Sequence, residues 1–431
     1  MIQRIRGFRD ILPDESGLWQ HIELTAAGLF ADFGFKEIRI PLMERTELFA
    51  RSIGEDTDIV EKEMYTLTDR GGDPITLRPE ATASVVRAYL QNKLYASEPL
   101  QKVYTIGPMF RRERPQKGRY RQFYQINVEV LGSASALVDA QLIFMLMRLM
   151  DRLGVRDVSV HLNSLGCPEC RPAYRERLLG YIDGRVDALC GDCRRRRQNN
   201  PLRVLDCKVP DCRQAMVAAP AMGDHLCDAC KAHFQTCRAV LTRLDVPFKI
   251  DNRLVRGLDY YTRTTFEIQT SALGAQSAVA GGGRYDGLMA ALGGPPLPAT
   301  GFAIGLDRLV EIVAQSVSGA AEGHQRLPDL YVAALGPQSQ EHACLWIAQL
   351  ADKGVWAEMD FEDRSLKSQM KRADRSGAAW TLIVGEREMA EGALVLRNMQ
   401  TKQQQSVSLE AVVPELLEQL VSNAAGRTES T

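Results

Sequence analysis

The stretch Leu254-Val255-Arg256-Gly257-Leu258-Asp259-Tyr260-Tyr261-Thr262-Arg263 decides how this chain is interpreted. An arginine, an aspartate and two tyrosines crowd between Arg256 and Tyr261. A second dense stretch, Gly281-Gly282-Gly283-Arg284-Tyr285-Asp286-Gly287-Leu288, follows shortly afterwards. Buried charges and phenols need hydrogen-bonding partners, so such a mixture of residues is not expected in an ordinary hydrophobic core. Glycine lets a backbone approach a ligand closely. Both stretches therefore indicate a binding site.

Composition places the chain among ordinary soluble globular proteins. It has 431 residues, enough for two or three domains, with 45% hydrophobic and 25% charged residues. The formal net charge is −1, from 53 basic and 54 acidic residues. The net charge therefore does not indicate a nucleic-acid partner, and any RNA would have to bind at local basic patches.

Nothing in the sequence predicts a membrane segment or a secretion signal. Met1–Gly7 has no apolar signal core, and the most apolar run, Leu142–Met150, is short and interrupted by Arg148. We therefore expect a cytoplasmic protein, in which the ten cysteines are thiols or metal ligands rather than disulfides.

Residues 1–166 and 245–313 are predicted to form one α+β unit. Apolar spacing predicts a helix over 18–33. A long alternating segment, 120–130, follows the charged loop 111–119, which predicts a hairpin with a basic tip. Further strands are expected at 35–40, 75–77, 103–106 and 264–269, and 301–313 is expected to pass from a strand or turn into a helix.

The remaining segments differ in composition. Residues 167–244 hold nine of the ten cysteines and the run Arg194-Arg195-Arg196-Arg197, and we interpret them as an inserted subdomain. Residues 314–327 are predicted to be a linker. In 328–423, strands at 329–335, 355–361, 379–384 and 393–397 alternate with helices at 339–353, 365–376 and 412–421, which favours a mainly parallel sheet. Residues 424–431 are expected to be a flexible tail.

Two motifs concentrate arginine where phosphate could bind. Phe110-Arg111-Arg112-Glu113-Arg114-Pro115 opens the basic hairpin tip. Arg308 lies in Gly301-Phe302-Ala303-Ile304-Gly305-Leu306-Asp307-Arg308-Leu309, where a helix is expected to begin. The planar guanidinium binds phosphate through two parallel hydrogen bonds. Taken alone, the loop could equally be a solvated tip.

Together these motifs resemble motifs 2 and 3 of class II aminoacyl-tRNA synthetases, and Gly34–Pro41 resembles motif 1, which lies at the dimer interface in that class. The two stretches quoted first resemble the histidine-specific signatures of the histidyl-tRNA synthetase family. The resemblance covers essentially the whole chain. It implies an α+β catalytic domain, built from an antiparallel sheet with helices, and a C-terminal α/β anticodon-binding domain.

The family's residue roles carry over by position. Arg256 and Arg111 would be catalytic, with Arg256 stabilising charge that develops in the transition state. Glu129 and Tyr261 would read the two imidazole nitrogens. The histidine-binding set would be Glu80, Thr82, Gln125, Glu129, Arg256, Tyr260, Tyr261 and Tyr285, with Gly283 and Arg284 also walling the pocket. The ATP-binding set would be Arg111, Glu113 and Arg308. The alternative for each residue is a structural ion pair or a turn glycine.

Contacts with tRNA are expected from the predicted helix 365–376 and from the motif 2 loop, and the run Arg194–Arg197 could either touch the tRNA acceptor arm or be a plain solvated run. In the predicted helix 365–376, Lys367, Lys371 and Arg375 share one face, opposite an apolar stripe. A basic stripe suits phosphate contacts, although a solvated amphipathic helix would have the same pattern. In the motif 2 loop, Arg114 and Gln116 are the candidates for the acceptor end.

Eight cysteines are spaced as in four-thiolate zinc sites. Cys167-x2-Cys170 and Cys190-x2-Cys193 are followed by Cys207-x4-Cys212 and Cys227-x2-Cys230. Zinc would explain how a small insertion is stabilised, whereas the alternative is that the thiols are buried as small apolar residues. The spacing does not determine which cysteines share a site, and Cys237 is left over.

The resemblance implies a homodimeric histidine–tRNA ligase acting on L-histidine, ATP with Mg²⁺, and tRNA(His). A different reading is a catalytically idle paralogue that senses histidine or regulates histidine biosynthesis. Such paralogues typically lack the anticodon domain and reactive arginines, whereas this chain keeps Arg111, Arg256 and Arg308. A class II synthetase for proline or threonine is disfavoured by the stretch quoted first and by Glu129.

Overall fold

The computed structural model describes residues 2–54, 57–115, 118–270, 278–316 and 326–428. The chain divides into two compact units, Met1–His324 and Gln325–Thr431. This division falls within the segment predicted to be a linker. No helix in the described ranges is long and apolar enough to cross a membrane.

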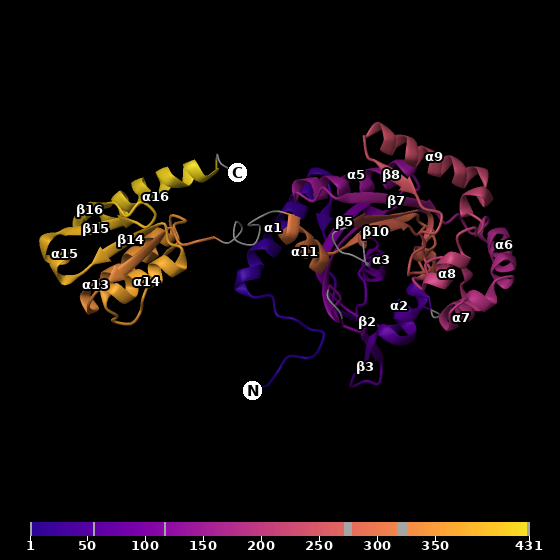
Figure 1. Cartoon of the computed structure of the whole chain (residues 1–431), viewed down its shortest axis with the longest axis horizontal. Coiled ribbons are helices and arrows are strands. Elements are labelled where there is room, and N and C mark those ends of the chain that lie inside the picture. Colours follow the sequence, from indigo (N-terminus) through magenta and orange to yellow (C-terminus); the bar gives the residue numbers. More distant parts are fainter. Residues whose placement is uncertain (1, 55–56, 116–117, 271–277, 317–325, 429–431) are drawn as a thin grey trace. The chain divides into compact units, whose positions relative to one another are not determined.

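An eight-stranded sheet forms the centre of the first unit (Figure 1). Its order is β1-β5-β6-β11-β10-β9-β7-β8, and only the edge pairs β1–β5 and β7–β8 are parallel. The antiparallel sheet expected for the catalytic domain is thus confirmed. The strands are β1 (Lys36–Glu37), β5 (Gln101–Phe110), β6 (Gln122–Leu131), β7 (Val158–Ser164), β8 (Phe248–Ile250), β9 (Thr262–Thr270), β10 (Ala278–Arg284) and β11 (Ala299–Gly305).

Side-chain alternation gives this sheet two different faces. In β6, Ile126 and Val128 belong to the main hydrophobic core, while Gln125, Asn127 and Glu129 occupy the positions between and beside them. The core face is covered by helices whose buried side chains join the same cluster: α1 (Pro13–Asp32), α5 (Ala136–Arg152), α9 (Asp228–Arg243) and α11 (Leu306–Ser316). The opposite face of the sheet carries the polar residues.

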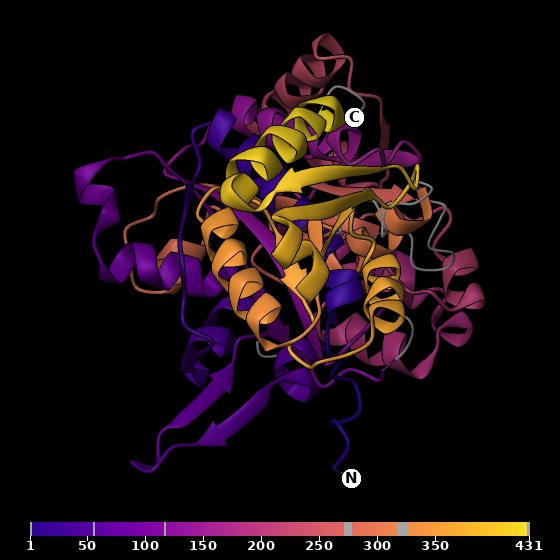
Figure 2. The same ribbon diagram turned by 90° about the vertical axis from the view of Figure 1, so that its left-hand side faces the viewer.

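The predicted hairpin is formed by β5 and β6, which pair along their whole lengths from Gln101↔Leu131 to Phe110↔Gln122. Beside it lies a small sheet of β2 (Met43–Arg45), β4 (Pro74–Leu77) and β3 (Tyr65–Thr68). Figure 2 shows this sheet, in purple, projecting away from the main sheet. The helices of this region are α2 (Thr46–Ile53), the π-helical turn η1 (Ile59–Glu63), α3 (Thr82–Gln91) and α4 (Leu94–Ser97).

The insertion lies between β7 and β8. It contains α6 (Arg171–Asp183), η2 (Val186–Ala188), α7 (Gly191–Asn199), η3 (Pro201–Val204), α8 (Pro210–Ala215), η4 (Met222–His225) and α9. Although α9 was predicted as part of the insertion, Phe234, Cys237 and Leu241 pack it into the catalytic core. The last helix of the cysteine-rich segment therefore belongs to the core by its packing.

The second unit contains a five-stranded sheet in the order β13-β12-β14-β15-β16. Only β12 pairs in parallel, with β13 and β14, whereas β14–β15 and β15–β16 are antiparallel. The prediction of a mainly parallel sheet is therefore wrong. It failed for two reasons: the connection from Val384 to Ala393 is too short for a parallel crossover, and the polar strand β16 carries little apolar alternation. The strands are β12 (Leu330–Ala334), β13 (Ala357–Met359), β14 (Trp380–Val384), β15 (Ala393–Asn398) and β16 (Gln404–Ser408).

Helices cover both faces of this second sheet. Leu330 and Val332 share a core with α13 (Pro337–Ala351) and α16 (Val412–Thr428), whereas Tyr331 and Ala333 pack with α14 (Leu366–Ser376) on the other face. A short helix, α15 (Glu386–Glu391), was not predicted.

Two segment boundaries also differ from those expected. The strand expected at 35–40 shrinks to β1, a two-residue edge strand. The helix α16 continues to Thr428, into the segment expected to be a tail.

Candidate active site

A cavity of about 300 Å³ opens on the polar face of the main sheet. Its floor comes from β6, β9, β10 and β11, and its walls come from the β5–β6 hairpin, loop 256–261 and the starts of α3 and α11. The lining brings together these residues from the predicted site: Glu80, Thr82, Arg111, Glu113, Gln125, Arg256, Tyr260, Tyr261, Tyr285 and Arg308. Chain segments more than 200 residues apart therefore meet at one site.

Glycines in the floor provide the space for this cavity. The Gly281–Gly283 triplet lies in strand β10 rather than in a loop. A Cβ at Gly281 would collide with the Arg256 guanidinium, and a Cβ at Gly301 would collide with the Glu129 carboxylate. The missing side chains make room for charged groups that come from other elements.

Glu129 lies at the base of the site and is 1% exposed. Thr82 Oγ1 donates to Glu129 Oε1 at 2.7 Å, and the Tyr285 hydroxyl donates to Oε2. Burial raises the pKa of Glu129 to about 8 although both hydrogen bonds favour the ionised form. Tyr285, expected as a wall residue, is thus a direct partner of the carboxylate expected to read the imidazole.

Glu80 is fixed by the beginning of α3. Its carboxylate accepts the backbone N–H groups of Thr82 and Ala83, each at 2.8 Å, and the Tyr260 hydroxyl at 3.4 Å. Burial raises the pKa of Glu80. The rings of Tyr260 and Tyr261 are 4.8 Å apart between centroids, so an aromatic wall stands beside two buried carboxyl groups.

Four buried polar atoms of the cavity lining lack a hydrogen-bond partner among the described residues: Glu113 Oε2, which is ion-paired with Arg119, and Gln125 Oε1, Asn127 Nδ2 and Arg256 Nε. A buried polar group without a partner costs about 1–3 kcal/mol, which a polar ligand would offset. Asn127 was not among the predicted site residues. Period-two spacing along β6 would have found it, because Asn127 stands between Gln125 and Glu129 on the same face.

Cationic side chains gather at another part of the cavity. Arg111 Nε donates to the Pro79 carbonyl at 2.9 Å, and its guanidinium lies over the Phe123 ring. Arg308 Nη1 donates to the Ala278 carbonyl at 2.7 Å. Burial lowers the pKa of Arg308, and the charges of Arg119 and Arg111 lower it further. This mutual repulsion makes the cluster suited to a polyphosphate anion.

Arg119 was not singled out in the sequence and joins this cluster through Glu113. Arg119 Nη1 lies 3.1 Å from Glu113 Oε2, and Arg111 Nη1 lies 3.9 Å from Glu113 Oε1. The Glu113 carboxylate therefore lies between the guanidinium groups of Arg111 and Arg119 at the tip of the hairpin.

Arg256 is oriented by two neighbours. Its Nη1 donates to Glu267 Oε2 at 2.9 Å, and its guanidinium lies 5.6 Å from the centroid of the Tyr261 ring. Burial lowers the pKa of Arg256, but Tyr261 and Glu267 outweigh burial and raise it. Glu267, on β9, was not predicted as a site residue, because an isolated glutamate in a strand carries no signal of its partner.

Arg284 does not wall the pocket as expected. It is fully buried and bonds Asp139 at 2.7 Å, Asp286 at 3.1 Å and two backbone carbonyls of the β6–α5 connection. His233 Nε2, on α9, lies 2.7 Å from the same Asp139 carboxylate. Burial would raise the pKa of Asp139, but His233 and Arg284 hold it below its usual value. Arg284 is thus a structural residue.

The run Arg194–Arg197 makes contacts within the protein. Arg194 bonds backbone carbonyls of 186–189, and Arg195 lies near Asp192. Arg196 pairs with Asp58 at 2.8 Å, and Arg197 pairs with Asp183. These contacts favour a structural reading over contact with tRNA. Of the hairpin-tip candidates, Arg114 is exposed, and Gln116 lies outside the described residues.

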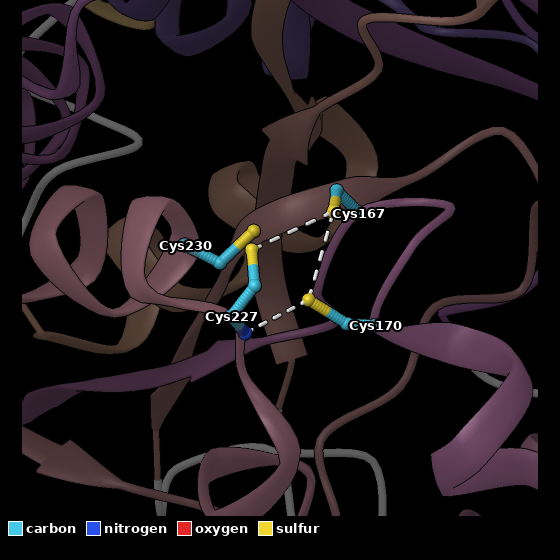
Figure 3. Close-up of side chains that lie close together, drawn as sticks. All are labelled: Cys167, Cys170, Cys227 and Cys230. Atoms are coloured by element: carbon cyan, nitrogen blue, oxygen red, sulfur yellow. Dashed lines mark hydrogen bonds between the residues drawn. The ribbon is translucent and has the colours of Figure 1, made fainter.

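The cysteines form two groups of four. Cys167, Cys170, Cys227 and Cys230 lie together (Figure 3), and so do Cys190, Cys193, Cys207 and Cys212. In each group the four sulfur atoms all lie within 4.8 Å of one another. The pairing that the sequence left open is thus nested: the first and last cysteine pairs meet, and the middle pairs meet.

The antiparallel sheet, its arginine-bearing hairpin and the arginine at the β11–α11 junction define a class II aminoacyl-tRNA synthetase. A family model described as Histidyl-tRNA synthetase matches residues 7–168 and 203–309, and an Anticodon binding domain model matches 329–419. The chain belongs to the histidyl-tRNA synthetase family.

Relatives agree with this assignment over the full length. The chain is 61% identical over 409 residues to a histidine–tRNA ligase of Desulfosudis oleivorans, covering 95% of this chain and 96% of that protein. It is 59% identical to a histidine–tRNA ligase of Desulforapulum autotrophicum, covering 99% of this chain and 100% of that protein. The crystal structure of apo S. aureus histidyl-tRNA synthetase is similar with a TM-score of 0.80 at 34% identity, covering 96% of this chain and 100% of that one.

The burial of Glu129 predicts a pH dependence of stability in the ligand-free protein. Because the carboxyl pKa rises from 4.5 to about 8 on folding, its contribution is fully present below pH 4.5 and is lost as pH rises through about 8. Glu129→Gln should therefore gain stability relative to wild type between pH 5 and 9, measured as urea midpoints. The exposed Glu98→Gln serves as the control, and parallel midpoints for wild type and Glu129→Gln would contradict the burial effect.

Gly281→Ala should displace Arg256, because the added Cβ would overlap its guanidinium. We expect histidine-dependent exchange of pyrophosphate into ATP to fall on the order of 100-fold, since misplacement of about 1 Å at a reacting centre has effects of this size. Gly287→Ala is the matched control, because its Cβ would meet nothing within 4 Å. Equal activity of the two variants would show that the room at Gly281 is not needed.

Proposed function

We propose that the chain attaches L-histidine to tRNA(His) in two steps. First, a histidine carboxylate oxygen attacks the α-phosphorus of ATP, and the bond to pyrophosphate breaks. Second, a hydroxyl at the 3′ end of the tRNA attacks the carbonyl carbon of histidyl-adenylate, and AMP leaves. The observation that carries the proposal is one cavity in which a buried carboxyl and tyrosine cluster adjoins a cluster of arginines.

The amino-acid side of the cavity suits histidine. Glu129 and Tyr261 would bond the imidazole nitrogens, while Glu80, Thr82 and Gln125 would hold the α-ammonium group. Tyr260 and Tyr285 would complete the pocket by fixing Glu80 and Glu129, to which they donate. An apolar side chain of similar size would leave these buried groups unpaired, which is the strongest form of selection against an analogue.

The arginines would act on the nucleotide. Arg111 would contact the α-phosphate and Arg308 the γ-phosphate, with Glu113 holding Arg111 and Arg119 apart. Arg256 would bond the histidine carboxylate and the α-phosphate, and would stabilise the negative charge of the pentavalent transition state. Since Glu267 already orients Arg256, little reorganisation is needed when that charge develops.

Mg²⁺ would enter with ATP and screen its phosphates. Glu113 and Glu267 line the cavity and offer the oxygen ligands that Mg²⁺ prefers. Both carboxylates already face arginines, so phosphate oxygens would supply most of the coordination. Zinc in the cysteine-rich insertion is the second metal of this proposal.

The second unit would bind the anticodon part of tRNA. Lys367, Lys371 and Arg375 lie exposed on α14 and make no ion pair with residues that the structure describes, whereas Arg372 pairs with Asp360 at 2.6 Å. Arg114 and Gln116 remain the candidates for the acceptor end. We also propose a homodimer in the cytoplasm, with the motif 1 segment Gly34–Pro41 at the interface.

The idle-paralogue alternative is disfavoured. The reactive arginines line the cavity, and the second unit matches the anticodon-binding model. An idle histidine sensor would need neither a polyphosphate cluster nor that unit.

Arg256→Ala tests the chemical step. We expect histidine-dependent exchange of pyrophosphate into ATP to fall roughly 100- to 1,000-fold, because a preorganised charge on the transition state is lost. Arg197→Ala, in the insertion, is the control and should keep activity. Exchange with histidine alone among the twenty amino acids would support the proposal, whereas histidine binding with no exchange in wild type would favour the idle paralogue.

Lys371→Glu tests the basic face of α14. The KM for tRNA should rise roughly tenfold at low salt, because a phosphate contact is lost and replaced by repulsion, while pyrophosphate exchange stays unchanged. Lys353→Glu, an exposed lysine in the same unit, is the charge-matched control. An equal effect of both variants would reduce the role of α14 to general charge.

A further inference from the structure

The two cysteine groups have the spacing of four-thiolate metal sites. In the first, Cys167 Sγ lies 3.6 Å from Cys170 Sγ and 3.9 Å from Cys227 Sγ. In the second, Cys190 Sγ lies 3.9 Å from Cys207 Sγ. Four thiolates at about 2.3 Å from one tetrahedral zinc ion are about 3.8 Å apart, whereas a disulfide needs about 2.05 Å.

Backbone N–H groups point at the sulfur atoms in the same way in both groups. The Cys227 N–H donates to Cys170 Sγ at 3.1 Å, and the Cys190 N–H donates to Cys212 Sγ at 3.1 Å (Figure 3 shows the first). Hydrogen bonds of this kind orient and stabilise metal-bound thiolates.

Cys237 shows what a merely packed thiol looks like in this protein. It lies in the main hydrophobic core among aliphatic and aromatic side chains, and it belongs to neither group of four. The eight grouped cysteines instead bring their sulfur atoms together, which small apolar residues have no reason to do.

The two groups of cysteines connect different segments of the insertion. The first joins the beginning of the insertion, at Cys167 and Cys170, to the start of α9, at Cys227 and Cys230. The second closes the segment between them, where α7 and η3 pack against each other. One ion in the first group would hold the base of the insertion, where its two ends meet, and one ion in the second group would hold its tip, around α7 and η3.

Both the base and the tip of the insertion contact the loop Arg256–Tyr261. Arg171, which directly follows Cys170, donates to the Tyr261 carbonyl. Arg203, between Cys193 and Cys207 in the sequence, donates to the Arg256 carbonyl at 3.1 Å. Asn200 Nδ2 donates to Asp259 Oδ1 at 2.7 Å.

We propose that each group of four cysteines binds one zinc ion, and that the two ions brace the loop Arg256–Tyr261 through Arg171 and Arg203. Buried side chains of the insertion, among them Tyr174, Leu178 and Ile182, belong to the same apolar cluster as Tyr260 and Tyr261 of this loop. The ions would therefore fix, within that shared packing, the two arginines that hold the loop. Arg171 and Arg203 are positioning residues, and their effect on the reaction rests on the proposed function.

Zinc content tests the sites without turnover. The full-length chain, purified without added metal, should contain about two zinc ions by mass spectrometry, from the two groups of four thiols. Cys230→Ser and Cys193→Ser should each retain about one, and the exposed Cys344→Ser should retain both. A folded wild-type chain that lacks zinc and has the eight grouped thiols open to alkylation would overturn the proposal, as would bound iron or disulfides.

A second measurement covers variants that fail to fold. Growth with Co²⁺ should give wild-type protein with the visible bands of tetrahedral cobalt and with a thiolate-to-cobalt charge-transfer band in the near ultraviolet, of which the second requires thiolate ligands. Protein without these bands would overturn the assignment.

The bracing is tested with Arg171→Ala and Arg203→Ala, which should keep both zinc ions. Arg171→Ala should raise the KM for histidine on the order of tenfold, because Tyr261 loses its support, and Arg203→Ala should mainly lower kcat through Arg256. Unchanged kinetics in both variants would overturn the bracing. A zinc-replete wild-type chain without exchange would overturn the proposed function alone.

Discussion

The structure depends on the period-two geometry of β6. A strand sends alternate side chains to opposite faces, so one segment can join the core through Ile126 and Val128 while Gln125 and Asn127 line the cavity. Glu129 lies on the same face, buried behind Thr82 and Tyr285, to which it is hydrogen-bonded. The helices α1, α5 and α11 hold the apolar face, which fixes the register of the strand. A slip of one residue would bury the polar set in the core and would remove the site.

Neighbouring protein groups, rather than solvent, provide the hydrogen bonds of the buried carboxyl groups. Glu80 is bonded by the N–H groups at the start of α3, and Glu129 by two hydroxyl groups. Gly281 and Gly301 leave the room that Arg256 and Glu129 occupy. The site is thus largely assembled before any ligand arrives, and the atoms still lacking partners are those that a polar ligand would meet.

Much of this could be predicted from the sequence, and the failures have physical causes. Alternation revealed the β5–β6 hairpin, and the dense signatures gave most of the cavity lining. Asn127 could have been found from the period of β6, whereas Arg119 and Glu267 were missed because only the fold brings them to Glu113 and Arg256. Arg284 was misread because a signature does not show which way a side chain points: Arg284, the last residue of β10, bonds the buried Asp139, whereas Tyr285 bonds Glu129. Cysteine spacing indicated metal chemistry, but only the fold shows that the outer and inner pairs are nested.

The carboxylate of Asp139 has a consequence for how this family can diverge. It is shared by Arg284, next to Tyr285 of the pocket, and by His233, on the last helix of the insertion. Removing one member of a buried charged group leaves the others uncompensated, at about 3–5 kcal/mol. Substitutions at the three positions should therefore occur together. If recombination replaced the insertion including α9, the matching α5 and β10 would have to be replaced with it. The insertion can therefore be exchanged only up to the start of α9, and the exchanged segment must still supply a Cys167 and Cys170 pair that fits Cys227 and Cys230 of the recipient.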